Sequence, residues 1–324
     1  MNCTEKVFQL KQNIKDVLIP FIDNDYLYLD LPYHSNLGDT LIWQGTLDFL
    51  KQIPYKCLYS CSVNGKKYSN IIKKNHSSII LFHGGGNFGD LWVLHNNFRK
   101  KIISEFPNHK MIVLPQTVFY NDSKHLEEDV QFYSNYPNVS ICARDIKSYN
   151  ILKENFHKNT IYLLPDMAFC MNINEYDRCH HEVKESLFIK RLDKELAFNG
   201  NYSSVPKNTI TSDWPTFMNN EYKEYIYLKI LNRYCGAIDR RLKTNINNII
   251  TDVYWKTVLR KKNVNLAINF IDKYKNIYTT RLHAAILGVI LNKTNITVFD
   301  NFYGKNSSFV NTWLSDVDSI RLIK

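Results

Sequence analysis

The sequence contains no uninterrupted run of about 18 apolar residues, the length that a membrane-spanning helix requires. Residues 1–15 carry several charges where a secretory signal peptide would need an apolar stretch. We therefore expect a soluble, cytoplasmic protein. The seven cysteines form an odd set without a Cys-x-x-Cys pair, which argues against a disulfide framework and against a zinc module. We interpret them as reduced thiols.

One short segment, Cys179-His180-His181, could suggest a metal site. Adjacent side chains on a loop rarely converge on one ion, and no partner motif follows them. We interpret this segment as a solvated loop.

Acidic residues are outnumbered by basic ones, 31 against 41, and the resulting net charge of +10 favours anionic partners. Phosphorylated metabolites, nucleic acid and anionic lipid all fit this charge, but no nucleic-acid-binding motif accompanies it. Basic clusters at residues 240–243 and 260–262 are typical of solvated helix faces. They are also compatible with peripheral contact to an anionic membrane.

Short apolar and β-branched runs alternate with helical patterns, which predicts an α/β fold with parallel strands. A chain of 324 residues also exceeds what one hydrophobic core usually organises, so we expect two domains, residues 1–175 and 176–324. The predicted strands are residues 26–31, 78–82, 110–114, 139–143, 160–164, 187–190, 208–211, 277–280 and 296–299. Helices are predicted at 91–106, 221–259, 265–274 and 282–291.

Nearly every predicted strand is followed by a polar or glycine-rich cluster. In open α/β sheets, ligands bind outside the carboxyl ends of the strands, so these clusters should line shared crevices. This placement favours an enzyme. The clusters lie at residues 36–39, 83–87, 115–117, 144–145, 165–166, 280–283 and 300–301.

The glycine-rich cluster at residues 84–89 has the G-x-G-x-x-G spacing between a predicted strand and a predicted helix. The next strand ends without the carboxylate that a dinucleotide site needs, and the chain has neither G-x-S-x-G nor G-K-[ST]. Three consecutive glycines still permit a ligand to approach backbone N–H groups at a helix N-terminus. A purely structural turn is the alternative.

Charged residues at strand ends supply the candidate chemistry. Arg144 and Arg281 each follow a strand that should be buried, where a guanidinium can bind carboxylate or phosphate. His283 stands near the start of a helix, where its ring could reach the same ligand and exchange a proton near neutral pH. Asp39 precedes an apolar helical pattern, so it could cap that helix, act in catalysis, or do both.

Taken in order, these motifs resemble those of the polysaccharide pyruvyltransferase family. The resemblance covers roughly residues 36–305 and depends on six short motifs in sequence order. They are N-x-G-D at 36–39, G-G-G-N at 84–87, P-Q-T at 115–117, A-R-D at 143–145, P-D at 165–166 and T-x-R-L-H at 279–283.

The resemblance implies two Rossmann-like domains that face a cleft, as in GT-B glycosyltransferases, and transfer of pyruvate from phosphoenolpyruvate to a saccharide as a ketal. It implies that Arg144, Arg281, Leu282 and His283 contact the donor, with His283 as the leading general acid or base. The chemistry of ketal formation, which must remove a proton from a sugar hydroxyl, makes Asp39 a candidate base. The same resemblance places the remaining motif residues in the cleft, on the acceptor side. These residues are Asn36, Gly38, Asp39, His83, Gly84, Gly85, Gly86 and Asn87.

The chemistry of phosphoenolpyruvate independently favours such residues, because two arginines and an imidazole balance its phosphate and carboxylate. We expect no nucleotide cofactor and no obligatory metal, and a saccharide or lipid-linked oligosaccharide as acceptor. Two alternatives remain open: a GT-B-like glycosyltransferase that uses a nucleotide sugar, and a non-catalytic binding protein.

Overall fold

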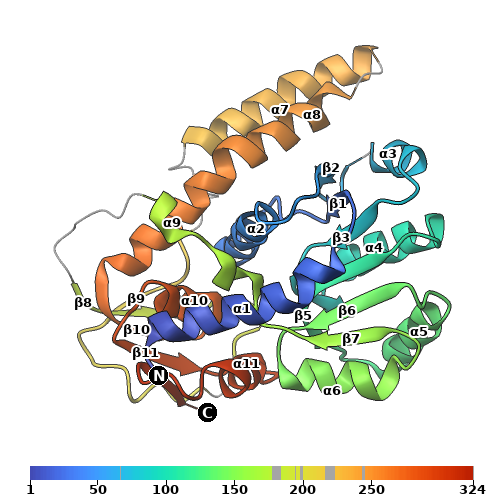
Figure 1. Cartoon of the computed structure of the whole chain (residues 1–324). Coiled ribbons are helices and arrows are strands. Elements are labelled where there is room, and N and C mark those ends of the chain that lie inside the picture. Colours follow the sequence, from blue (N-terminus) through green and yellow to red (C-terminus); the bar gives the residue numbers. More distant parts are fainter. Residues whose placement is uncertain are drawn as a thin grey trace.

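The computed structural model describes residues 1–323 except 66, 177–183, 194, 198–199, 216–222 and 243–244. The described chain is a mixed α/β protein with two parallel sheets (Figure 1). The first sheet has the strand order β2-β1-β3-β5-β6-β7, and β4 pairs with β5 beside this path. Its strands are β1 (Tyr26–Leu29), β2 (Cys57–Cys61), β3 (Ile79–Phe82), β4 (Gly85–Gly89), β5 (Met111–Phe119), β6 (Val139–Ala143) and β7 (Thr160–Leu163).

The second sheet has the strand order β12-β11-β10-β8-β9. Its central strand β10 pairs in parallel with β8 and β11, so the buried middle of the sheet comes from segments far apart in sequence. Its strands are β8 (Lys184–Ile189), β9 (Ile210–Ser212), β10 (Tyr274–Thr279), β11 (Asn295–Phe299) and β12 (Ile320–Ile323).

Helices cover the sheets because each presents an apolar surface to them. The helix α10 (Leu282–Ile290) is buried along its whole length, as its almost uniformly apolar sequence requires. Further helices are α2 (Leu37–Leu50), α3 (Tyr68–Lys74), α4 (Val93–Glu105), α5 (Ser123–Ser134), α6 (Ile146–Asn155), α9 (Arg260–Asp272) and α11 (Lys305–Trp313). Among the described residues, no helix combines the length and the apolar character needed to cross a bilayer.

The first helix, α1 (Cys3–Phe21), runs beside both sheets (Figure 1). Cys3 and Leu10 belong to the apolar core of the second sheet, whereas Ile14 and Leu18 belong to a core of the first. The N-terminal segment therefore contributes to the packing of both sheets, and the boundary between residues 175 and 176 stays a prediction.

The region predicted as helical over residues 221–259 forms a projecting hairpin of α7 (Lys223–Leu242) and α8 (Ile246–Tyr254) (Figure 1). Residues 221–222 and 243–244 of this region lie outside the described chain. A π-helical turn at Trp255–Leu259 then joins α8 to α9.

Candidate active site

A cavity of about 680 Å³ opens where residues that follow strands of both sheets meet. Residues after β1, β3 and β6 form one side, and residues after β8, β9, β10 and β11 form the other. This is the edge at which parallel sheets usually bind ligands. Its lining comprises Asp30, Pro32, His34, Ser35, Asn36, Asp39, His83, Gly84, Gly86, Asn87, Leu91, Trp92, Val93, Leu94, His95, Arg144, Arg191, Glu195, Trp214, Arg281, Leu282, His283 and Lys305.

Most of the residues singled out from the sequence line this one cavity. They are Asn36, Asp39, His83, Gly84, Gly86, Asn87, Arg144, Arg281, Leu282 and His283. Two others, Gly38 and Gly85, do not line it and instead lie directly behind lining side chains. The structure brings these residues together, while their individual roles stay predictions.

The buried carboxylate of Asp166 links the two sides of the cavity. Arg144 donates from Nη1 to Oδ2 of Asp166 at 2.7 Å, and Nε2 of His283 lies 3.3 Å from the same oxygen. Burial alone would raise the pKa of Asp166, but the nearby His283 and Arg144 reverse that effect and hold the pKa well below its usual range. Asp166 therefore stays ionised and orients both the guanidinium and the imidazole.

The position of His283 depends on the absence of a side chain at Gly38 in α2. His283 lies in the first turn of α10, as predicted, and its ring packs on the backbone of Gly38. A methyl group added at Gly38 would lie 2.4 Å from Nδ1 of His283. Gly38 thus contributes space for the imidazole rather than a surface of the cavity.

The glycine-rich segment does not form a helix N-terminus, so that part of the prediction is wrong. Residues Gly85–Gly89 form strand β4, and α4 begins only at Val93. Gln116 of β5 holds the segment, since its Nε2 donates to the carbonyl of His83 at 2.7 Å and its Oε1 accepts from the N–H of Asn87 at 3.1 Å. Gly85 has a φ of 129°, which favours glycine.

Asp39 does not cap α2 either, because Asn36 takes that position. Oδ1 of Asn36 accepts from the N–H of Gly38 at 3.0 Å, and Nδ2 of Asn36 donates to Oδ2 of Asp39 at 2.8 Å. Burial would raise the pKa of Asp39, but His34 and His283 lower it below its ordinary value. Asp39 is therefore a carboxylate that faces the cavity.

Arg281 is already engaged by carboxylates. Its Nε and Nη2 donate to the two oxygens of Asp213 at 2.5 and 2.6 Å, and Nη2 also lies 3.1 Å from Asp193. This bidentate pairing fixes the guanidinium beside His283.

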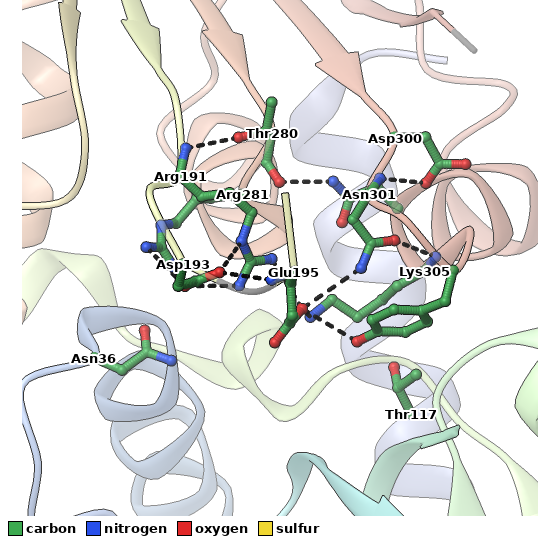
Figure 2. Close-up of polar contacts among 12 residues, drawn as sticks. Asn36, Thr117, Arg191, Asp193, Glu195, Thr280, Arg281, Asp300, Asn301 and Lys305 are labelled. Carbon is green, nitrogen blue, oxygen red and sulfur yellow. Dashed lines mark hydrogen bonds and ion pairs between the residues drawn. The ribbon is translucent and has the colours of Figure 1, made fainter. Parts of the chain in front are cut away.

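Sequence reasoning missed an ionic network on the second-sheet side, which Figure 2 shows. Lys305 donates from Nζ to Oε2 of Glu195 at 2.6 Å, and Arg191 donates to the same oxygen at 2.9 Å. Burial would raise the pKa of Glu195, but these two cations hold it well below its usual range. Asn301 supports the network by accepting from the N–H of Lys305 at 2.7 Å. Of these residues, only Asn301 belonged to a cluster recognised at a strand end.

Gly86 lies between a cation from each side of the cavity. A methyl group at this position would lie 3.4 Å from Nη2 of Arg144 and 4.0 Å from Nζ of Lys305. The space above Gly86 is therefore flanked by two cationic side chains, each of which is also paired with a buried carboxylate, Asp166 or Glu195. Such a space can accept an anionic group.

Histidines occupy the first-sheet side of the cavity. Burial lowers the pKa of His83 to about 4, so the ring is neutral near pH 7, and its Nδ1 lies 2.6 Å from the hydroxyl of Tyr28. His95 lies 2.6 Å from Asp30; burial opposes protonation of His95, but this carboxylate outweighs it and raises the pKa. Within the described ranges no three of His, Cys, Asp and Glu group as metal ligands, and Cys179-His180-His181 lie outside those ranges.

Chemically, the cavity combines cations that can hold a small anion with groups that can move a proton. Arg144, Arg281 and Lys305 supply positive charge, and His283 and Asp39 are the proton-transfer candidates. This combination suits transfer of an acidic group from a phosphorylated donor.

Comparisons with known proteins identify the family. The chain matches the family described as polysaccharide pyruvyl transferase over residues 36–301. EpsO of Bacillus subtilis, whose name carries a provisional assignment as a pyruvyl transferase, is 30% identical over the whole of this chain and 96% of its own length. Pyruvyl transferase 1 of Schizosaccharomyces pombe is 26% identical over 88% of this chain and 69% of its own.

A solved structure has a similar fold. It is an uncharacterised protein of Klebsiella pneumoniae with a TM-score of 0.65 and 20% identity, and the match covers 97% of this chain and 98% of that one. This likeness concerns the fold alone.

Proposed function

Because this chain belongs to the polysaccharide pyruvyl transferase family, we propose that it transfers pyruvate from phosphoenolpyruvate to a sugar of a capsular or exopolysaccharide, forming a ketal. In this proposal the two sheets form Rossmann-like domains that face a cleft in a GT-B-like arrangement, and the 680 Å³ cavity is the reaction site. The proposal rests on one observation of the site. Arg144 and Lys305 flank Gly86, while Asp166 contacts both Arg144 and His283.

The donor would lie with an anionic group above Gly86. Arg144 and Lys305 would bind this group from opposite sides, and Arg281 would meet the second anionic group of phosphoenolpyruvate. Leu282 lines the cavity between Arg281 and His283 and would pack against the methylene end of the donor. The acceptor would enter along Asn36, Asp39 and the glycine-rich segment.

The reaction requires two linked proton transfers. His283 would deliver a proton to the methylene carbon, making the neighbouring carbon electrophilic, and Asp39 would take the proton of the attacking sugar hydroxyl. A carbon–oxygen bond to the sugar forms, the bond to phosphate breaks, and inorganic phosphate leaves. Attack by a second hydroxyl closes the ketal; its proton would return to His283, and the proton held by Asp39 would leave with the phosphate.

The direct test offers phosphoenolpyruvate with a panel of saccharides and measures phosphate release together with a mass gain of pyruvate. If His283 transfers the proton, His283→Gln should lower kcat by about 10²–10⁴-fold with a modest change in KM for phosphoenolpyruvate. Arg281→Lys should chiefly raise KM, because it loses the planar fork. A His283→Gln enzyme with near-normal kcat at saturating donor would remove His283 from the chemical step.

The competing glycosyltransferase reading predicts a different ligand. Thermal unfolding measured with phosphoenolpyruvate and with several nucleotide sugars separates the two, because a bound ligand stabilises the folded state. Stabilisation by a nucleotide sugar alone would favour the glycosyltransferase.

A peripheral membrane position is the last part of the proposal, and α7 supports it. Tyr227, Tyr234 and Leu242 on this helix are 60%, 69% and 62% exposed, and they recur at spacings that place them on one face. Arg240 and Arg241 lie at the end of the same helix. An apolar face next to basic residues fits the surface of an anionic bilayer.

In the second basic cluster, Lys261 and Lys262 are exposed, whereas Arg260 is not free to reach a membrane. Arg260 points into the protein, where it donates to Gln44 and lies over the ring of Trp43. Lys262 pairs with Glu224 at 2.9 Å. The membrane proposal therefore depends chiefly on α7.

A further inference from the structure

A second cavity, of about 600 Å³, lies between the α7–α8 hairpin and the residues that follow β1 and β2. We propose that this hairpin cavity binds sugar residues of the acceptor chain beyond the one that is modified. The inference rests on the proposed function, because it concerns the same acceptor.

The lining of the hairpin cavity contains more uncharged polar side chains than charged ones, which suits a hydroxyl-rich ligand; its charged residues are Lys67, Lys229 and Asp252. Five side-chain amides line it, and amides donate and accept hydrogen bonds as sugar hydroxyls do. They belong to Asn64, Asn232, Asn245, Asn247 and Asn248. Aromatic residues among them offer flat apolar surface with polar edges, which suits the C–H face of a sugar ring.

Two of the amides are held in fixed orientations. Oδ1 of Asn232 accepts from Thr251 at 2.8 Å, and Nδ2 of Asn248 donates to Asn245 at 2.8 Å. In the described part of the chain, no hydrogen bond engages Nδ2 of Asn232 or Oδ1 of Asn248. The cavity thus presents one oriented donor and one oriented acceptor.

The wall of the hairpin cavity is fixed to the first sheet by Tyr33. Its ring stacks on Trp255 with centroids 5.4 Å apart and planes 2° from parallel, and its hydroxyl donates to Asp252 at 2.5 Å. Lys256 extends this link by donating to Asp252 and to the carbonyl of Ser60, both at 2.6 Å. A fixed wall lowers the entropic cost of binding.

The hairpin cavity also lies next to the reaction site along the chain. Tyr33 lines the hairpin cavity, while its neighbours Pro32 and His34 line the 680 Å³ cavity. In this proposal, a saccharide chain with its reacting sugar at Asp39 would continue past this segment into the hairpin cavity. Recognition of several sugars at once would let the enzyme distinguish a polymer or its lipid-linked precursor from a free sugar.

The test measures saccharide binding without phosphoenolpyruvate. Saturation-transfer NMR would compare mono-, di- and tetrasaccharides of glucose, galactose and N-acetylglucosamine on the whole protein. We expect at least one tetrasaccharide to bind roughly tenfold more tightly than its monosaccharide, since two or more hydrogen bonds each contribute about threefold to tenfold. The double variant Asn232→Ala, Asn248→Ala should erase this length preference.

Two further variants guard against a folding artefact. Asn64→Ala alters an exposed loop residue on the opposite wall and should weaken tetrasaccharide binding without affecting the hairpin. Asn150→Ala, on the exposed side of α6, lines none of these cavities and should change nothing.

The proposal fails if no tetrasaccharide is preferred, or if the preference survives both the double variant and Asn64→Ala. The results distinguish failure of this inference from failure of the proposed function. Length-dependent binding without pyruvyl transfer would contradict the reaction and leave the subsite standing. Transfer with the same kcat/KM for monosaccharide and tetrasaccharide would contradict the subsite and leave the reaction standing.

Discussion

At the scale of single residues, the space at Gly38 decides where the imidazole of His283 lies. A methyl group there would come within 2.4 Å of Nδ1 and 2.8 Å of Cγ, and the ring is also held by Asp166. We predict that Gly38→Ala displaces the ring and lowers kcat by at least about tenfold, because misplacing a catalytic group by roughly 1 Å is costly. The fold should persist, since the clash is with a side chain.

Steady-state kinetics with circular dichroism would check this prediction. Gly86→Ala is the matched control, because its methyl group would make only ordinary contacts with Arg144 and Lys305. That variant should raise KM for phosphoenolpyruvate and leave kcat nearly unchanged. Full activity in folded Gly38→Ala would mean that the ring can shift without loss.

The buried ring of His83 makes the stability of the protein depend on pH. Burial lowers its pKa to about 4, against roughly 6.5 in an unfolded chain. Between these values the unfolded state takes up a proton that the folded state does not, so the free energy of unfolding falls as the pH falls. The stability is fully present above about pH 6.5, and the complete loss by His83 is about 3 kcal/mol.

Urea unfolding at pH 7, 6 and 5 would measure this slope. His83→Asn should flatten it, even if the variant is less stable at every pH. His95 acts in the opposite direction, because its raised pKa favours the folded state at lower pH. The difference in slope between the unmodified protein and His83→Asn therefore isolates the contribution of His83. Equal slopes in the two proteins would contradict a lowered pKa of His83.

At the scale of elements, α2 packs on the turn at Met167–Cys170 through Gly45. A methyl group there would lie 2.0 Å from the carbonyl oxygen of Met167, and backbone cannot move away cheaply. We predict that Gly45→Ala destabilises the protein by about 1–3 kcal/mol in spite of the better helix propensity of alanine.

Gly236 in α7 provides the comparison. Its added methyl group would have 3.8 Å to the nearest heavy atom, so Gly236→Ala should raise the free energy of unfolding by about 0.5–1 kcal/mol. Denaturant unfolding of both variants measures the contrast. The same sign for both would show that the contact at Met167 is easily relieved.

Most of the strands that could be predicted from sequence are buried, although the predicted strands 160–164 and 208–211 correspond to β7 and β9, which lie at sheet edges. β3 is a continuous apolar run and β6 is apolar except for Ser140, and both are buried at every residue, which is the pattern of a parallel sheet. β2 and β12 lie at sheet edges with partly exposed residues, and β4 contains three glycines, so neither periodicity nor propensity marks them.

The residues of the candidate site likewise divide into those that the sequence predicts and those that it does not. The strand-end rule located Arg144, Arg281 and His283, which line one cavity. Lys305 and Glu195 could not be found from their local sequence, because the ion pair that they form at the site joins residues 110 positions apart. The α7–α8 hairpin could not be divided from the sequence, because Ile recurs in both halves.

At the scale of the whole molecule, the hairpin extends away from the two sheets and carries the exposed face of α7 (Figure 1). We predict that the protein binds vesicles containing phosphatidylglycerol in a salt-dependent manner. Arg240→Gln with Arg241→Gln should weaken binding by roughly 30-fold, since each basic residue near the surface contributes about 1 kcal/mol.

The apolar face should act separately from the charges. Tyr227→Ser with Tyr234→Ser removes two exposed rings and should weaken vesicle binding even at high salt, where the arginines contribute little. Phe8→Ser is the matched control, because Phe8 is 71% exposed on α1 rather than on α7. Co-sedimentation with neutral and anionic vesicles at two salt concentrations measures all three variants. Binding that is equal for both vesicle types, or equally reduced by Phe8→Ser, would show that α7 does not hold the enzyme at a membrane.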